Sequence, residues 1–430
     1  MNIAVIGAGY VGLVTAACFA KLGSKVFCID NDRDKIQKLN KGIIPIFEPG
    51  LEELVKQNKK SGRIKFTTSI KDGIKDTDVV FICVGTPPTG DGDSDLSAVE
   101  NVARVIAREM RGYKLIVGKS TVPVNTGEWI KHTVKLYNNA NIEFDVASNP
   151  EFLREGTAIY DFLNPDRIVI GVESEKAKKL LLELYKPLDA PKLVTNIATA
   201  ELIKHAANSF LATKISFINA LSVICEKVGA DVKQIANGMG YDKRIGRAFL
   251  DAGPGFGGAC FPKDVSAFIK IAEKLEYDFS LLKDTAKINL EQRNFIVKKI
   301  QDALWIAKGK VIGVLGLSFK PNTDDTRGSP AIEIAKKLFD LGAHIKAYDP
   351  KAMEKAKIDA PKFQYCKNPY EVAKDSHALV VLTDWDEFKK LDLKKIKKLL
   401  KTPILIDARN IYEPKLMNEI GFIYKSVGRS

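Results

Sequence analysis

The sequence predicts an α/β protein in which two parallel β-sheet domains are joined by a long central helix and a helical region. Residues 1–195, and a second stretch from about residue 308, alternate short apolar runs with helical patterns. Between them, residues 199–229 contain no proline, and their glycine comes only at the end. The 430 residues, 45% of them hydrophobic, suffice for two or three domains with a sizeable core.

The first domain contains strand-like runs that are rich in β-branched residues and hardly alternate apolar with polar side chains. Such runs are expected of strands buried on both faces of a parallel sheet, with helices between them forming right-handed crossovers. The runs are "NIAVIGAG", "KVFCID", "DVVFICVG", "KLIVGKST", "FDVASNP" and "DRIVIGV".

The central segment and the second domain follow. Apolar positions in residues 199–229 recur at helical spacing on more than one face, which predicts a long buried helix and a candidate subunit interface. The strand pattern then restarts with "KVIGVLGLSF", "HIKAYDP", "ALVVLTDW" and "PILIDARN". The first turn of this smaller unit, from Gly313 to Gly316, lacks a full glycine fingerprint and need not hold a dinucleotide. The predicted regions are 1–198, 199–300 and 301–430.

A glycine motif opens the first domain. Gly7, Gly9 and Gly12 form G-x-G-x-x-G directly after the first strand and at the start of a helix. Asp30 ends the second strand, where a carboxylate accepts from a ribose 2′-OH and repels a 2′-phosphate. We therefore expect two Rossmann-like domains, the first binding NAD rather than NADP. The alternative is a glycine turn in a domain without ligand.

Composition restricts the class of partner and the compartment. The net charge of +13 comes from lysines spread along amphipathic helices, which favours a solvated surface over nucleic-acid binding and suits an anionic small substrate. No apolar run approaches the roughly 20 residues that span a bilayer, and the N-terminus reads as a strand. Six scattered cysteines without C-x-x-C pairs indicate a reducing compartment, and four histidines are not spaced as metal ligands. We expect a cytoplasmic protein without a metal.

The segment "GPGFGGACFPKD" contains a candidate reactive cysteine. Pro262 suits the first position of a helix, so Cys260 lies at the N-terminal edge, where the helix dipole and Lys263 favour the thiolate. Gly255, Gly257 and Gly258 are expected to let a bulky ligand approach the backbone. An isolated cysteine is more often an inert core residue, but this setting favours a reactive one.

Other polar residues are candidates for the same chemistry. Lys204 and Asn208 share one face of the long helix and could stabilise an oxyanion, or simply meet solvent. Glu151 and Glu155 are expected one helical turn apart, either as base or ligand contact or as charges at a helix start. Thr121, after a strand and before a proline, is a candidate for holding a water or a substrate oxygen.

Eight segments, in order along almost the whole chain, carry a family resemblance. They are "GAGYVGL", "IFEPGLEEL", "GTPPTGDGDSDLSAV", "STVPVNTG", "NPEFLREGTA", "ELIKHAANSFLATKISFINALS", "GFGGACFPKD" and "GLSFKPNTDDTRGSP". On these segments the chain resembles the UDP-glucose/GDP-mannose dehydrogenase family. The resemblance implies a four-electron oxidation of UDP-glucose to UDP-glucuronate at C6, with two NAD+ consumed and no metal.

The resemblance also implies roles for individual residues. Cys260 is implied to trap an aldehyde as a thiohemiacetal, which a second oxidation turns into a thioester that water releases. Lys204 and Asn208 match an oxyanion-stabilising pair, and Asp264 matches an aspartate that acts with an ordered water. Glu151 and Thr121 match groups that assist hydrolysis, and Glu155 matches a position near the nicotinamide.

Contacts and assembly are implied in the same way, with NAD in residues 1–198 and UDP in residues 301–430. Arg244 resembles an arginine that reaches a neighbouring subunit's sugar, which implies a homodimer or a higher homo-oligomer with residues 199–300 at its interface. The implied cofactor contacts are Gly7, Gly9, Tyr10, Val11, Gly12, Asp30, Lys35, Thr86, Pro87, Thr121, Glu155, Lys263 and Arg327. The implied substrate contacts are Glu151, Phe152, Leu153, Lys204, Asn208, Arg244, Phe249, Gly257, Cys260, Lys320 and Arg409.

Three other functions remain open at this point. A sister enzyme acting on GDP-mannose or a UDP-N-acetylhexosamine differs only in sugar and base recognition, which spacing does not decide. A two-electron β-hydroxyacid or 6-phosphogluconate dehydrogenase shares a similar lobe and long helix but needs no thiol. A non-enzymatic NAD-binding protein, with its basic surface on nucleic acid, is the third alternative.

Overall fold

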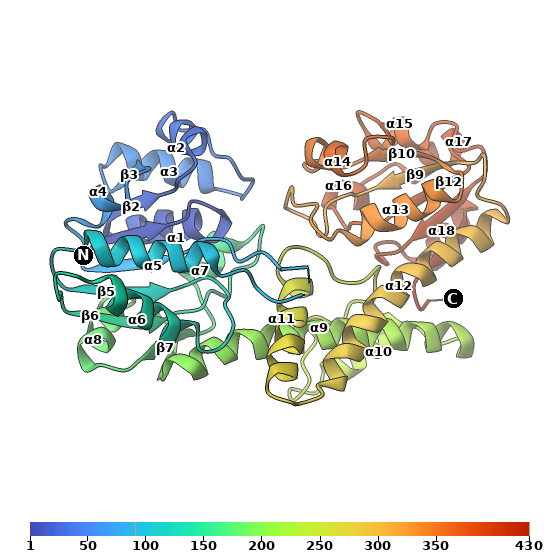
Figure 1. Ribbon diagram of the computed structural model, residues 1–430. Coiled ribbons are helices and arrows are strands. Elements are labelled where there is room, and N and C mark those ends of the chain that lie inside the picture. The colour runs from blue at the N-terminus through green and yellow to red at the C-terminus, as the bar shows by residue number, and fades with distance from the viewer. Residues whose placement is uncertain (91, 430) are drawn as a thin grey trace. The chain divides into compact units, whose positions relative to one another are not determined.

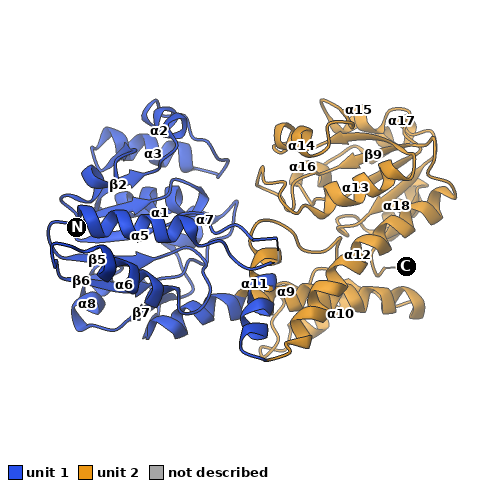
Figure 2. Ribbon diagram, in the orientation of Figure 1, with its two compact units in different colours: residues 1–207, 266–276 blue, residues 208–265, 277–430 orange. Residues whose placement is uncertain are grey.

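The computed structural model describes residues 1–90 and 92–429, and its helices and strands are labelled in Figure 1. The chain divides into two compact units (Figure 2). Unit 1 comprises Met1–Ala207 and Ser266–Glu276, and unit 2 comprises Asn208–Val265 and Tyr277–Ser430. Two helices, α9 (Ile197–Val228) and α11 (Phe261–Lys274), contribute residues to both units.

Unit 1 contains a sheet with the strand order β3-β2-β1-β4-β5-β6-β7-β8. Neighbouring strands are parallel except β6 and β7, which pair antiparallel. The strands are β1 Asn2–Ile6, β2 Lys25–Ile29, β3 Ile64–Thr67, β4 Val79–Ile82, β5 Lys114–Gly118, β6 Phe144–Ser148, β7 Ile168–Val172 and β8 Lys192–Thr195. The helices are α1 Tyr10–Lys21, α2 Arg33–Asn40, α3 Leu51–Lys60, α4 Ile70–Ile74, α5 Ser97–Glu109, α6 Thr126–Tyr137, α7 Ala158–Leu163 and α8 Glu175–Leu184.

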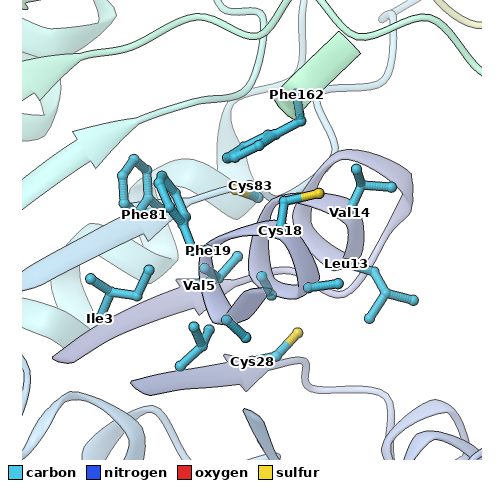
Figure 3. Packing of buried hydrophobic residues seen from close by; sticks show 14 of the residues in the cluster. Ile3, Val5, Leu13, Val14, Cys18, Phe19, Cys28, Phe81, Cys83 and Phe162 are labelled. Carbon is cyan, nitrogen blue, oxygen red and sulfur yellow. The ribbon is translucent and has the colours of Figure 1, made fainter. Parts of the chain in front are cut away.

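The strands of this sheet are buried on both faces, as the continuous apolar runs predict. Along β1, Ile3 and Val5 join the core formed with α1, α3, α7 and α8, while Ala4 and Ile6 join the core formed with α4, α5 and α6. Figure 3 shows the first of these cores, in which Phe19 of α1 packs against other aromatic rings. The strand order reverses between β1 and β4, and ligands bind such sheets at the carboxyl ends beside that reversal.

Unit 2 contains a smaller sheet, entirely parallel, with the order β11-β10-β9-β12-β13-β14. Its strands are β9 Val311–Leu315, β10 His344–Tyr348, β11 Gln364–Tyr365, β12 Ala378–Val381, β13 Ile404–Asp407 and β14 Ile423–Ser426. Its helices are α10 Val232–Gly240, α12 Ser280–Leu304, α13 Pro330–Asp340, α14 Met353–Asp359, α15 Pro369–Ala373, α16 Asp386–Lys389, α17 Leu393–Leu399 and α18 Pro414–Ile420. The predicted α/β class with two Rossmann-like sheets is confirmed, although the first sheet contains one antiparallel pair, β6 and β7.

The predicted long helix is α9, with 32 residues. Within the described part of the chain it is also the one helix that is long and apolar enough, by length and composition alone, to cross a membrane. However, Glu201, Lys204 and His205 are buried along it and bind other segments of unit 1. Buried polar contacts of this kind are typical of a core helix in a globular protein.

Candidate active site

The glycine turn of unit 1 has the geometry that the motif predicts. Gly7 has φ +103°, and its amide donates to the Ile29 carbonyl. A side chain at Gly12 would begin 1.8 Å from the Gly7 carbonyl oxygen, so α1 packs closely on the turn. At Gly9, by contrast, nothing lies within 4 Å of the position that a β-carbon would occupy. That open space directly precedes Tyr10, the first residue of α1, where a phosphate group can approach backbone amides.

Asp30 lies beside the same glycine turn and accepts a hydrogen bond from it. Its carboxylate accepts from the amides of Ala8 at 2.7 Å and Asp32 at 3.0 Å, and it pairs with Lys35 at 3.0 Å. Asp30 and Lys35, both predicted cofactor contacts, are therefore brought together beside the glycine turn. Thr86 lies after β4, and its hydroxyl donates to the Thr121 carbonyl at 2.9 Å, which also brings those two predicted residues together.

Glu151 and Lys204 form a buried ion pair in unit 1. Lys204 Nζ lies 2.9 Å from Glu151 Oε1, and both side chains are about 95% buried, as exposures of 5% and 4% show. The other carboxylate oxygen of Glu151 accepts from the Leu153 amide at 2.6 Å. The Lys204 amine also lies 5.2 Å from the Phe152 ring centroid. The interpretation of Lys204 as a solvent-facing lysine is therefore wrong.

The expected helical spacing of Glu151 and Glu155 is also wrong. Residues 151–154 form no helix, and α7 begins only at Ala158. Gly156, with φ +84°, lies in the left-handed region just before α7. The two carboxylates therefore belong to a loop, residues 149–157, and do not serve as charges at a helix start.

Sequence analysis missed the buried residues that hold this loop. Lys119 donates to Asn149 at the start of the loop, and Glu48 accepts from the amides of Gly156 and Ala158 at its end, at 2.6 and 2.7 Å. Tyr10 also donates to Glu48 and thereby links the glycine turn to the loop. The available signals were a lysine two residues before Thr121 and a glutamate in the "IFEPG" segment.

Cys260 of unit 2 lies where the sequence predicts. It directly precedes α11, and its carbonyl accepts the Asp264 amide at 2.8 Å in the first turn. Asp264 is fully buried and accepts from the Asn208 side-chain amide at 2.6 Å, while Lys263 Nζ lies 3.1 Å from its other oxygen. Cys260, Asp264, Asn208 and Lys263 thus form a compact group at the start of α11.

Cys260 differs from the other cysteines in its exposure. It is exposed, whereas the other five thiols are buried, and none of the six forms a disulfide in the described residues. Burial raises the pKa of the Cys18 and Cys83 thiols to about 12. The same cause raises the pKa of the remaining three thiols, which are Cys28, Cys225 and Cys366. Among the six cysteines, Cys260 is therefore the one whose side chain is open to reagents.

The glycines before Cys260 pack closely against other segments of unit 2. A side chain at Gly255 would begin 2.5 Å from Asn289 Oδ1, one at Gly257 2.3 Å from the Gly328 carbonyl oxygen, and one at Gly258 2.8 Å from the Phe319 ring. Packing within unit 2 therefore requires these glycines. The approach of a ligand to another side of this backbone stays a prediction.

Two predicted substrate contacts, Arg409 and Lys320, and one predicted cofactor contact, Arg327, lie around this segment. Arg409 donates to the carbonyls of Leu382 and Phe319, both at 2.9 Å, and lies beside Gly253. Lys320 follows Phe319, and its amine lies 5.6 Å from that ring. The Arg327 carbonyl accepts from the Gly258 amide.

Phe249 and Arg244 differ in their relation to the thiol. The Phe249 ring lies 6.1 Å from that of Phe261, next to Cys260. Arg244 is 90% exposed and pairs with Asp242 in the same turn. No contact within the described part of one chain brings Arg244 to the thiol.

Three family models match the chain in order. They describe the NAD binding domain over residues 1–189, the central domain over 198–291 and the UDP binding domain over 313–414 of one family. The chain belongs to the UDP-glucose/GDP-mannose dehydrogenase family. The predicted family, oxidoreductase class and NAD cofactor are confirmed. The glycine turn and Asp30 lie in the NAD binding domain. Cys260 lies in the central domain, and Arg409 lies in the UDP binding domain.

Known members of the family resemble the whole chain. UDP-glucose 6-dehydrogenase TuaD of Bacillus subtilis is 49% identical, over 100% of this chain and 93% of its own length. A solved UDP-glucose dehydrogenase from Pyrobaculum islandicum is 40% identical with a TM-score of 0.94, covering 100% of this chain and 98% of its own. A solved UDP-D-ManNAc dehydrogenase from Pyrococcus horikoshii is 30% identical with a TM-score of 0.88, over 100% and 99%.

Proposed function

We propose that this protein oxidises UDP-glucose to UDP-glucuronate through a covalent intermediate on Cys260. The balanced reaction is RCH2OH + 2 NAD+ + H2O → RCOO− + 2 NADH + 3 H+. The observation that carries the proposal is the exposed Cys260 thiol at the start of α11, beside the buried Asn208–Asp264 pair. Relatives that act on UDP-glucose, at 40% and 49% identity over the whole chain, support the substrate.

A thiol has a definite purpose in such a reaction. Bound NAD supplies the hydride acceptor. The Cys260 sulfur adds to the C6 aldehyde, forming a C–S bond, and this keeps the aldehyde from diffusing away before the second oxidation. Loss of the second hydride gives a thioester, and water then breaks the C–S bond and restores the thiol.

The buried polar groups supply charge stabilisation and proton transfer. Asn208 is proposed to donate to the oxygen that becomes negative in the thiohemiacetal, and Lys204 to act with it. Asp264, held by Asn208 and Lys263, accepts the proton of the reacting group. Glu151 and Thr121 are proposed to orient the hydrolytic water, since the Glu151 carboxylate is fixed by Lys204 and by the Leu153 amide. Glu155 is proposed to lie near the nicotinamide.

The number of NADH molecules formed per sugar nucleotide tests the mechanism. We expect two in the wild type, and loss of full turnover in Cys260→Ser, with Cys225→Ser as a control because Cys225 is buried. A ratio of one, or a Cys260→Ser variant with full turnover, would mean an ordinary two-electron dehydrogenase. If no sugar nucleotide yields NADH, the alternative that remains is a non-enzymatic NAD-binding protein.

The identity of the sugar is tested separately. The resemblance to a UDP-D-ManNAc dehydrogenase makes UDP-N-acetylhexosamines the second candidate substrates, followed by GDP-mannose. A panel of UDP- and GDP-sugars with NAD, read by NADH absorbance, is expected to give the highest kcat/KM with UDP-glucose. A higher value for another sugar reassigns the substrate and leaves the chemistry at Cys260 unchanged.

We also propose a cytoplasmic homodimer or higher homo-oligomer formed through α9. Phe210, Phe217 and Ile224 are 66%, 52% and 55% exposed, and their seven-residue spacing aligns them on one face of the helix. An exposed apolar stripe of this kind is typical of an interface. Arg244, exposed on the same unit, is the proposed contact to the neighbouring sugar. Light scattering of Phe217→Asp, with Lys227→Asp as a surface control, is expected to show a smaller particle only for Phe217→Asp.

A further inference from the structure

Lys119 is a buried cation for which the reaction above assigns no purpose. Only 4% of the residue is exposed, and it lies directly after β5, two residues before Thr121. Its amine donates to Asn149 Oδ1 at 2.9 Å, to the Asn149 carbonyl at 3.3 Å and to the Tyr185 hydroxyl at 3.4 Å. All three acceptors are neutral. A buried ammonium group held by neutral acceptors is costly, so a specific purpose is expected.

Asn149 connects this cation to the loop that carries Glu151. Its side-chain amide donates to the Val169 carbonyl at 2.8 Å, its backbone amide donates to the Gly118 carbonyl at 2.8 Å, and its Oδ1 also accepts from Tyr185. Asn149 is 1% exposed. Because Pro150 restricts the backbone that follows, fixing Asn149 fixes the point from which Glu151 extends.

Lys119 and Glu151 also border the same space. A cavity of about 160 Å³ in unit 1 is lined by Lys119, Asn149, Glu151 and Tyr185. Burial lowers the pKa of Lys119 to about 8, while the nearby Cys83 and Glu151 charges act in the opposite direction and Lys204 adds to the lowering. The other charged groups that line the cavity are Arg154, Asp161, Asp166 and Arg167.

We propose that Lys119 is a positioning residue for Glu151, which it holds in place through Asn149. Lys204 pairs with the carboxylate directly, and Lys119 supports it through Asn149 at the start of the loop. This inference depends on the hydrolytic role proposed for Glu151. The two are distinguishable, because the wild-type NADH ratio tests that mechanism without reference to Lys119.

The test compares Lys119→Met with Lys119→Arg, and with Lys178→Met as a control for loss of an exposed lysine. In Lys119→Met we expect kcat to fall roughly tenfold because the base is less well placed. We expect the KM for UDP-glucose to change by less than about threefold. The fall of kcat that we expect in the wild type as pH rises through about 8, where Lys119 loses its proton, should be absent from Lys119→Met. A covalent sugar-nucleotide adduct should accumulate and be visible by intact mass spectrometry.

Lys119→Arg keeps the charge and hydrogen-bond donors and is expected to restore most of kcat. It should also hold its kcat to a higher pH than the wild type, because an arginine stays charged above pH 8 or so. A merely structural role predicts a lower melting temperature with an unmoved pH profile. An unmoved profile in Lys119→Met, or a kcat within about twofold of the wild type, would overturn the proposal.

If Lys119→Met does not fold, Tyr185→Phe tests the proposed anchoring of Asn149 instead. This variant keeps the ring packing against Phe19 at 5.4 Å but removes the hydroxyl that binds Asn149. Because Lys119 remains, we expect kcat to fall by roughly two- to threefold, with the fall of kcat above about pH 8 retained. A wild-type kcat in this variant would contradict an anchoring role for Asn149.

Discussion

The turn after the first strand has the same backbone conformation in both sheets, but the polar groups around it differ. In unit 1 the amide of Gly7, with φ +103°, donates to the last residue of β2. In unit 2 the amide of Gly316, with φ +92°, donates to Tyr348, the last residue of β10. An aspartate follows in each case. The same strand crossover therefore presents a carboxylate at the same place in both sheets.

The two aspartates are used differently. Asp349 is 1% exposed and accepts from six donors: the amides of Leu317, Ser318, Lys351 and Ala352, the Ser318 hydroxyl and the Trp385 indole. Asp30 accepts from three donors, Ala8, Asp32 and Lys35. A carboxylate has about four acceptor positions. Asp349 is therefore saturated, while Asp30 keeps capacity for a ribose hydroxyl.

The helix that follows each turn differs as well. In unit 1, α1 begins at Tyr10, so its free amides lie beside the strand end. In unit 2 the next helix, α13, begins only at Pro330, after a loop that carries Lys320 and Arg327. A helix N-terminus binds a pyrophosphate through amides and dipole, whereas this loop offers cationic side chains. One topology thus places different polar groups after the first strand of each sheet.

Gly12→Ala should have the largest effect on this comparison. Its β-carbon would lie 1.8 Å from the Gly7 carbonyl oxygen, so α1 would have to move away from the sheet. We expect unit 1 to lose about 3 kcal/mol or more of unfolding free energy, measured by denaturant titration. An unchanged midpoint would mean that α1 does not pack on the turn this closely.

Asp349→Asn should come next. An amide presents its own N–H groups to donors that now face a carboxylate, so we expect a loss of about 2 to 3 kcal/mol of stability. Asp30→Asn is the matched variant and should lose less stability and more NAD affinity. Equal melting temperatures for the two variants would contradict the difference in saturation.

Gly9→Ala should separate folding from cofactor binding. Because nothing lies within 4 Å of the new methyl group, the melting temperature should stay within about 1 or 2 °C of the wild type. The methyl group occupies the space reserved for the pyrophosphate, so NAD affinity in calorimetric titration should fall by roughly 10- to 100-fold. Wild-type affinity would show that the pyrophosphate does not approach Gly9.

Glu201 should give the smallest effect. Burial raises its pKa from an ordinary value of 4.5 to about 7, although the backbone amides of Gly127 and Asn125 act against this. The folded state therefore binds the extra proton between those two values, and stability falls as pH rises from 4.5 to 7. Glu201→Gln removes this dependence.

We expect the difference in stability between pH 5 and pH 8 to shrink by about 1 to 2 kcal/mol in Glu201→Gln. Thermal unfolding at the two pH values measures it. Asp407 of unit 2, whose pKa is also raised by burial, is the matched site, so Asp407→Asn should change the same difference for the other sheet. If the stability difference between pH 5 and pH 8 is unchanged in Glu201→Gln, other groups must cause the pH dependence of unit 1.

The central strands were predictable and the edge strands were not. Every run identified from the sequence lies inside a sheet, where continuous burial leaves a continuous apolar pattern. The four missed strands, β3, β8, β11 and β14, are the four sheet edges. Edge strands are short or partly exposed, as "KLVT" of β8 shows, so their sequences carry little signal.

The candidate site shows the same division. Local motifs gave the glycine turn, Asp30 and Cys260, because each depends on residues adjacent in sequence. Lys119 and Glu48 were missed because they act on a loop that lies 30 and 108 residues away along the chain. The helical reading of Glu151 and Glu155 failed because spacing alone does not reveal the loop between Pro150 and Gly156.

The contrast between Cys260 and the five buried thiols has a practical consequence for preparations of the protein. A maleimide or iodoacetamide added in the native state should label Cys260 rapidly, while burial protects the others until the chain unfolds. The fast-reacting equivalents per chain then count the correctly folded chains in a sample. Dividing turnover by that count, rather than by total protein, places variants of different folding yield on one scale.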